Sequence, residues 1–174
     1  MAPAWLDHLE ALPYRAEPAA EEVRLREYPV ALGIRQQMRT ADLMREFQLL
    51  ALDGKHGPGG GHTPDLLLHF AATMYESFGA ELEAPRLQLE RAHAAGDAVT
   101  ELRFPLVAQT PTALLGYARL MEDADAFCAS GLLIYVDPDP EVYALRRWTV
   151  EEFMRQFHGH EPRAWAAAVD HQPK

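Results

Sequence analysis

The sequence predicts a single α+β domain that is mainly helical and carries a small two- or three-stranded sheet. Several long segments repeat apolar residues at three- and four-residue spacing, and shorter segments alternate apolar with polar residues. A length of 174 residues fits one domain with one core. The hydrophobic share of 48% against 24% charged residues is typical of a globular chain.

Three regions are expected along the chain. Residues 1–22 are rich in Ala, Pro and Glu, and we interpret them as a flexible N-terminal extension with at most a short helical turn. Residues 23–165 carry the periodic patterns and are expected to form the domain, with Trp165 as an anchor near its end. Residues 166–174 are interpreted as a C-terminal tail.

Proline, glycine and capping residues delimit the expected elements. Thr63-Pro64-Asp65 and Asp137-Pro-Asp-Pro each offer a cap followed by a proline at the first helical position. The expected helices cover about 34–50, 64–78, 82–95, 111–129 and 140–157. The expected strands cover 23–30 and 98–105, and 132–136 is either a third strand or a buried connector.

The glycine-rich segment at 54–63 is interpreted as a hinge or loop. It is not a P-loop, because Lys55 precedes the glycine cluster and Thr63 is separated from that lysine. Cys128 is a single cysteine, which excludes an internal disulfide and is typical of a cytoplasmic protein. The eight histidines lack the spacing of a ligand set, so neither a metal nor a cofactor is predicted.

The net charge of −10 argues against nucleic acid and anionic lipid as partners, because both would repel an acidic chain. No basic region followed by an apolar stretch opens the sequence, and no run approaches the roughly 20 apolar residues that cross a bilayer. We therefore expect a cytoplasmic protein with no membrane partner.

Asp125 and Arg146 are the most informative residues, because each lies on the apolar face of its predicted helix. An unpaired charge at such a position would cost several kcal/mol. The two helices are joined by a short connector, which favours antiparallel packing. We interpret the two residues as a buried ion pair that sets the register of the helices. The alternative is a polar site in which Arg146 binds an anionic ligand or Asp125 acts as an acid or base.

The last predicted helix also carries arginine and tryptophan residues that are typical of interaction surfaces. The candidate binding residues are Arg146, Arg147, Trp148 and Arg155. Trp148 lies off the main apolar arc, so it serves either as a partner anchor or as a contact for the N-terminal extension or the segment around Trp165.

Three segments resemble a small, functionally uncharacterised family of cytosolic proteins from high-GC bacteria. They are Leu43-Met-Arg-Glu-Phe-Gln-Leu-Leu-Ala, Met121-Glu-Asp-Ala-Asp-Ala-Phe-Cys and Tyr143-Ala-Leu-Arg-Arg-Trp-Thr-Val-Glu-Glu-Phe-Met-Arg-Gln. The resemblance covers about residues 23–165 and includes a Pro-x-x-Trp ending at Pro162-Arg-Ala-Trp. Members are encoded beside anti-sigma-factor ATPases, STAS-domain antagonists and related phosphatases, which implies a regulatory setting and brings no catalytic residues.

These observations predict a non-enzymatic regulatory protein that binds another protein in a cytoplasmic bacterial signalling pathway. One alternative is a small-molecule sensor with an anionic ligand between the helices of Asp125 and Arg146. The other is a hydrolase with an acid–base pair in the same place. A closed interface at Arg146 would count against both alternatives, and a pocket of several hundred Å³ would favour them.

Overall fold

The computed structural model describes residues 4–13, 15–52, 82–129 and 139–166. In chain order its elements are α1 (Ala4–Glu10), β1 (Glu22–Pro29), α2 (Val30–Leu52), a helix over 82–95, β2 (Val99–Pro105), α4 (Thr110–Ala129) and α5 (Pro140–Phe157). The prediction of a mainly helical α+β domain is confirmed, with a two-stranded antiparallel sheet in the described part of the chain. The expected helix over 64–78, the glycine-rich loop and the 132–136 segment lie outside the described residues.

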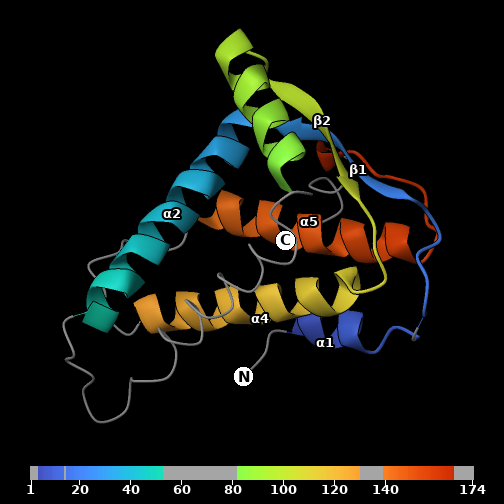
Figure 1. Ribbon diagram of the computed structural model, residues 1–174, viewed down its shortest axis with the longest axis horizontal. Helices are drawn as coiled ribbons and strands as arrows, with labels where there is room; N and C mark the ends of the chain where they lie inside the picture. Colours follow the sequence, from blue (N-terminus) through green and yellow to red (C-terminus); the bar gives the residue numbers. More distant parts are fainter. Residues whose placement is uncertain (1–3, 14, 53–81, 130–138, 167–174) are drawn as a thin grey trace.

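Helix α5 is the element around which the others are arranged. Helices α2 and α4 and strand β1 all pack against it, and α1 packs on α4 (Figure 1). Its start follows from the sequence, because Asp139 caps the first turn by accepting a hydrogen bond from the Glu141 amide at 3.0 Å. Pro140 at the first helical position needs no amide partner.

The two strands pair with a bulge that decides which side chains enter the core. Leu25 faces Leu102 and Tyr28 faces Thr100, so β1 contains one more residue than β2 between these pairs. Glu27 adopts a left-handed conformation with φ of 53° at this point. Without the extra residue, strict alternation would turn Glu27 inward. The bulge turns Tyr28 inward instead.

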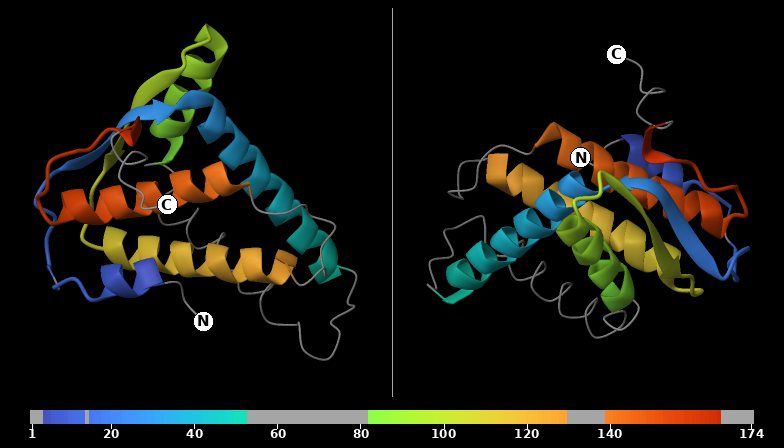
Figure 2. Two further views of the ribbon diagram at one scale, coloured as in Figure 1. Left: turned by 180° about the vertical axis from the view of Figure 1, so that it is seen from behind. Right: turned by 90° about the horizontal axis from the view of Figure 1, so that it is seen from above.

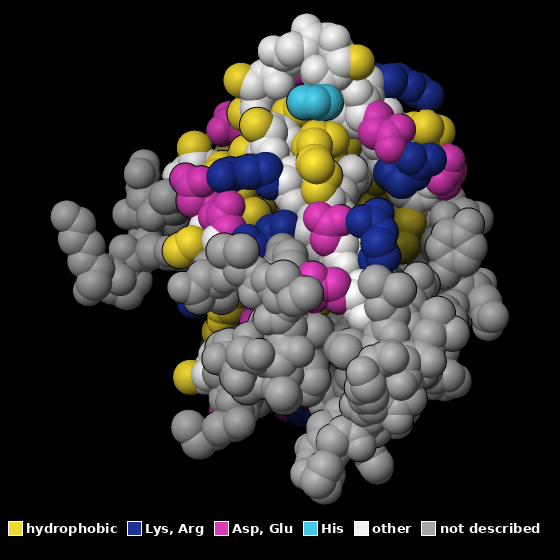
Figure 3. Space-filling view, turned by 90° about the vertical axis from the view of Figure 1, so that its left-hand side faces the viewer, with side chains coloured by type: hydrophobic (Ala, Val, Ile, Leu, Met, Phe, Trp, Pro, Cys, Tyr) yellow, Lys and Arg dark blue, Asp and Glu magenta, His cyan; other side chains and the backbone are white. Residues whose placement is uncertain are grey.

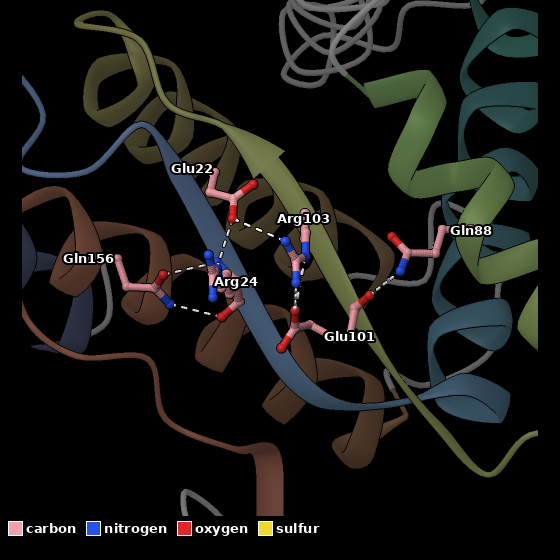
Figure 4. A network of polar contacts seen from close by, with 6 residues as sticks. All are labelled: Glu22, Arg24, Gln88, Glu101, Arg103 and Gln156. Atoms are coloured by element: carbon pink, nitrogen blue, oxygen red, sulfur yellow. Dashed lines mark hydrogen bonds and ion pairs between the residues drawn. The ribbon is translucent and has the colours of Figure 1, made fainter.

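Side chains from flanking helices contact the backbone of both strands (Figure 4). The Gln156 amide of α5 donates to the Arg24 carbonyl at 3.0 Å and accepts from the Arg24 amide N–H at 2.9 Å. Gln88, from the helix over 82–95, donates to the Glu101 carbonyl on β2. The outward faces of the strands carry the charged side chains of Glu22, Arg24, Glu101 and Arg103.

The main core lies between the sheet, α5 and the start of α2. It joins buried residues from all these elements and from the helix over 82–95: Val23, Leu25, Tyr28, Val30, Leu32, Leu89, Ala92, Leu102, Leu106, Val142, Leu145, Trp148, Phe153 and Phe157. Figure 2 shows from two sides that the helix over 82–95 lies beside the sheet and that α2 runs from the sheet past α5 towards the end of α4. None of the described helices is long and apolar enough to cross a membrane.

The N-terminal region differs from the expected flexible extension over residues 1–22. Residues 4–10 form helix α1, whose Leu6 and Leu9 are buried with Ala118 of α4 and Val150 of α5 in a second apolar cluster. Four apolar residues, Trp5, Leu6, Leu9 and Leu12, repeat over two turns. Burial of this short stripe, rather than helix propensity, holds α1 in place.

On the face seen in Figure 3, acidic and basic side chains lie beside one another among hydrophobic ones. Local pairs account for this pattern, such as Arg45 with Asp42 at 3.0 Å on α2. Opposite charges therefore pair along the helices even though the chain has a net charge of −10.

Gly33 of α2 is expected to be intolerant of a side chain. A Cβ at this position would collide with the Tyr28 ring and lie 3.1 Å from Cδ2 of Leu89. The gain in helix propensity from Gly33→Ala is about 1 kcal/mol, whereas overpacking costs about 1–3 kcal/mol. We expect a net loss in the free energy of unfolding, measured by urea denaturation. Tyr28→Val should relieve the loss in a double-mutant cycle, and additive effects would contradict the proposed collision.

Candidate functional site

The Arg146 side chain of α5 is surrounded by acidic and aromatic groups at the junction of α2, α4 and α5. Its guanidinium forms an ion pair with the Asp125 carboxylate and lies 3.5 Å from Oε1 of Glu122, both on α4. It also lies 5.2 Å from the centre of the Tyr143 ring. The Arg146 side chain is only 7% exposed, and that of Asp125 is 21% exposed. The pair expected from the sequence is thus brought together, with Asp125 half-buried rather than buried.

A chain of hydrogen bonds links this pair to the N-terminal helix. The Tyr143 hydroxyl donates to Glu122 at 3.4 Å, and the Trp5 indole N–H donates to the same hydroxyl at 3.1 Å. Trp5 belongs to α1, so the docking of α1 depends on the same polar groups that hold α4 against α5. No local pattern predicts this connection, because Trp5 and Tyr143 are 138 residues apart in the sequence.

The electrostatics of the cluster follow from burial opposed by ion pairing. Burial acts to lower the pKa of Arg146, but the Asp125 carboxylate and the other acidic neighbours outweigh it and the pKa is raised. Burial raises the pKa of Glu122, although Arg146 and Tyr143 oppose this shift. Burial also raises the pKa of Tyr117, which faces the cluster from α4. Arg146 is therefore a permanent cation, and Asp125 is its principal counter-ion.

The space left at Arg146 is small. A cavity of about 20 Å³ lies between α2, α4 and α5, lined in part by Gln36, Thr40, Tyr117 and Asp125. This volume is sufficient for one water molecule, whereas small-molecule sites span about 300–1,000 Å³. Within the described residues, the geometry at Arg146 therefore supports neither the sensor nor the hydrolase alternative.

Glu122 provides a test of this electrostatic description. Its raised pKa means that the folded protein keeps a proton that the unfolded chain has lost, so stability falls as the pH rises above the ordinary value of 4.5. Glu122→Gln removes that titration and leaves Asp125 to pair with Arg146. We expect the variant to lose less stability than the wild type as the pH rises above 4.5, measured by urea denaturation at each pH. A steeper loss in the variant would contradict the raised pKa.

The four candidate binding residues do not form one surface. Arg146 faces α4, and Trp148 is only 2% exposed because it packs against Trp165 at 5.4 Å and Tyr28 at 6.3 Å between ring centres. Trp148 therefore cannot anchor a partner, as one of the two interpretations of the sequence expected. It packs against the segment around Trp165, as the other interpretation expected. Arg155, whose side chain is 33% exposed, lies 3.6 Å from the buried Glu152 carboxylate.

Arg147 is the most exposed of the four candidates and lies at the edge of a groove. Its side chain is 40% exposed, forms an ion pair with Glu151 at 2.7 Å, and lies 5.9 Å from the centre of the Trp5 ring. Residues of α1 and α5 enclose a groove of about 490 Å³ here, which we call the α1/α5 groove: Ala4, Trp5, His8, Leu9, Arg147 and Glu151. Its rigid aromatic wall comes from Trp5, whose indole is fixed by Tyr143.

Glu152 is a second buried charge that the sequence interpretation missed. Its side chain is fully buried and accepts hydrogen bonds from the Arg163 amide and guanidinium, both at 2.9 Å, and from the Gln156 amide at 3.2 Å. A signal was present, because Glu152 follows the apolar residue Leu145 by seven residues, which places both on the same side of the helix. Its partner Arg163 follows the helix and lies outside its periodic pattern.

The described residues contain no group of three His, Cys, Asp or Glu side chains arranged to hold a metal ion. His158 instead lies with its two ring nitrogens 2.7 Å and 3.1 Å from the carbonyls of Met154 and Pro13. The side chain of Cys128 lies outside the described part of the chain.

The fold and site define a small helical α+β protein with a polar helix junction and an aromatic surface groove. Comparison with known proteins adds no family to this class: no family model matches the chain, and neither a curated protein nor a solved structure is significantly similar to it.

Proposed function

We propose that this protein is a non-enzymatic regulatory protein that binds another protein in a cytoplasmic bacterial signalling pathway. The observation that carries the proposal is the α1/α5 groove, in which Trp5 and Arg147 stand side by side. Tryptophan and arginine are the residue types that most often dominate binding energy at protein interfaces. The resemblance to proteins encoded beside anti-sigma-factor and STAS regulators supplies the pathway.

Preorganisation of the groove favours binding, because few side chains need to be ordered when a partner arrives. The Trp5 ring is held by its hydrogen bond to Tyr143, and Arg147 is held by Glu151. The overall charge of −10 favours the approach of a partner with a basic surface.

Affinity capture from the native host, followed by quantitative mass spectrometry, tests the proposal. The wild type is compared with Arg147→Ala and with a matched control, Arg103→Ala. Both arginines are surface residues paired with a neighbouring glutamate, but Arg103 lies on β2. We expect a protein partner whose recovery falls about tenfold or more with Arg147→Ala, as for an interface hot spot, and is unchanged with Arg103→Ala. Recovery of no partner, or equal recovery by both variants, would overturn the proposal.

A further inference from the structure

The chain reverses direction after α5 and packs its next residues against the sheet. Ala164 forms a parallel bridge with Arg26 of β1, and the Arg163 guanidinium reaches the buried Glu152 carboxylate. Trp165 packs edge-on against Trp148. We call residues 161–166 the returning segment.

The site that receives the returning segment is made by other parts of the molecule. Glu152 and Trp148 lie on α5, and Arg26 lies at the bulge of β1. Gln156 binds the backbone of Arg24 on the same edge of β1 (Figure 4), next to the position where Ala164 continues that edge. The receiving site is therefore specific for an extended segment that carries arginine and, two residues later, tryptophan.

His158 and Gly159 form the turn after α5 that brings the returning segment back onto its own chain. His158 ends α5 with φ of −86° and ψ of 4°, and Gly159 follows with φ of +88°. A left-handed conformation of this kind costs a residue with a Cβ about 1–2 kcal/mol. Glu161 precedes a proline and is biased towards an extended conformation. Straightening of the backbone at His158 and Gly159 would thus direct the intact segment away from its own receiving site.

We propose that the returning segment exchanges between two copies of this chain, so that the segment of each copy occupies the receiving site of the other. The exchanged dimer keeps the Glu152–Arg163 and Trp148–Trp165 contacts and changes only the hinge. Such exchange of an identical element is a low-cost route to a symmetric dimer. Attachment within one chain favours the monomer at low concentration, and the dimer is favoured as concentration rises.

Cysteine pairing between two different chains tests the exchange. One chain carries Arg26→Cys and the other Ala164→Cys, both with Cys128→Ser and with tags of different size. Bridged residues on neighbouring strands lie about 4.8 Å apart, within the range of a disulfide. After mixing and oxidation, we expect mixed-chain disulfides in excess of the share given by random pairing. Arg103→Cys replaces Arg26→Cys as the control and should give only the random share. A random share for both pairs would overturn the proposal.

Substitution of the hinge glycine provides an independent measurement. Gly159→Ala penalises the reversal and should raise the ratio of dimer to monomer by about fivefold or more, measured by light scattering after size-exclusion chromatography. Gly96→Ala is the matched control, because Gly96 has φ of +77° and lies far from the hinge in sequence. A Cβ at residue 159 would also lie 3.2 Å from Cβ of Ala19. Gly159→Asn tolerates the left-handed conformation but carries this Cβ, so it should raise the ratio of dimer to monomer less than Gly159→Ala does. A Gly159→Ala protein with the dimer content of the Gly96→Ala protein would overturn the proposal.

Discussion

Replacement of Arg146 with Met is expected to lower the free energy of unfolding by about 3–5 kcal/mol at pH 7. The substitution keeps most of the apolar volume and removes the cation that faces Asp125 and Glu122. Two partly buried carboxylates would then lie close together without a counter-ion. Urea denaturation followed by circular dichroism measures the loss.

Arg147→Met on the same helix is the control, because Arg147 is 40% exposed and its pair with Glu151 is a surface ion pair. Its cost should stay below about 1 kcal/mol. Asp125→Asn combined with Arg146→Met should recover part of the loss, since it removes one of the unpaired charges. An Arg146→Met protein as stable as the Arg147→Met protein would contradict the assignment of Arg146 as the central ion-pair partner.

Glu152→Ala is expected to have a comparable effect, about 3–5 kcal/mol, because a fully buried charged acceptor of three hydrogen bonds is lost. The Arg163 amide and guanidinium and the Gln156 amide would lose their shared partner. The returning segment should then detach, with faster hydrogen exchange at residues 163–165 and a changed Trp fluorescence.

Glu141→Ala is the control on the same helix, because Glu141 is 70% exposed and pairs with Arg35 of α2. It should leave hydrogen exchange in the returning segment unchanged and cost about 1 kcal/mol or less. If Glu152→Ala leaves the protection of the Arg163 amide intact, Glu152 does not hold the segment.

Helices α2, α4 and α5 and the helix over 82–95 were predictable because their signals are local. The limits of α5 follow from the Asp-Pro cap and the spacing of its apolar residues, and both are present in a short stretch of sequence. Asp125 and Arg146 were found for the same reason, since a charge on an apolar face is visible in each helix separately. The short connector between the helices then made their pairing geometrically simple.

The features that the sequence did not predict depend on contacts between segments far apart in the chain. Trp148 lies off the main apolar arc of α5, and its burial requires Tyr28 from the bulged strand and Trp165 from the returning segment. The docking of α1 likewise depends on Tyr143 and on an apolar patch of α4 and α5. No pattern within residues 4–10 predicts that α4 and α5 form an apolar patch against which these residues can pack.

The two glutamine contacts on the strands have a consequence for solubility. A two-stranded sheet exposes two edges, and unpaired backbone groups on an edge can recruit strands from other molecules. Gln156 occupies the backbone groups of Arg24 on one edge, and Gln88 occupies the Glu101 carbonyl on the other. Each glutamine amide forms hydrogen bonds that a neighbouring strand would otherwise form. Within the residues that the structure describes the sheet has two strands, and these glutamine contacts, together with the bridge between Arg26 and Ala164, protect its edges from the pairing that begins aggregation.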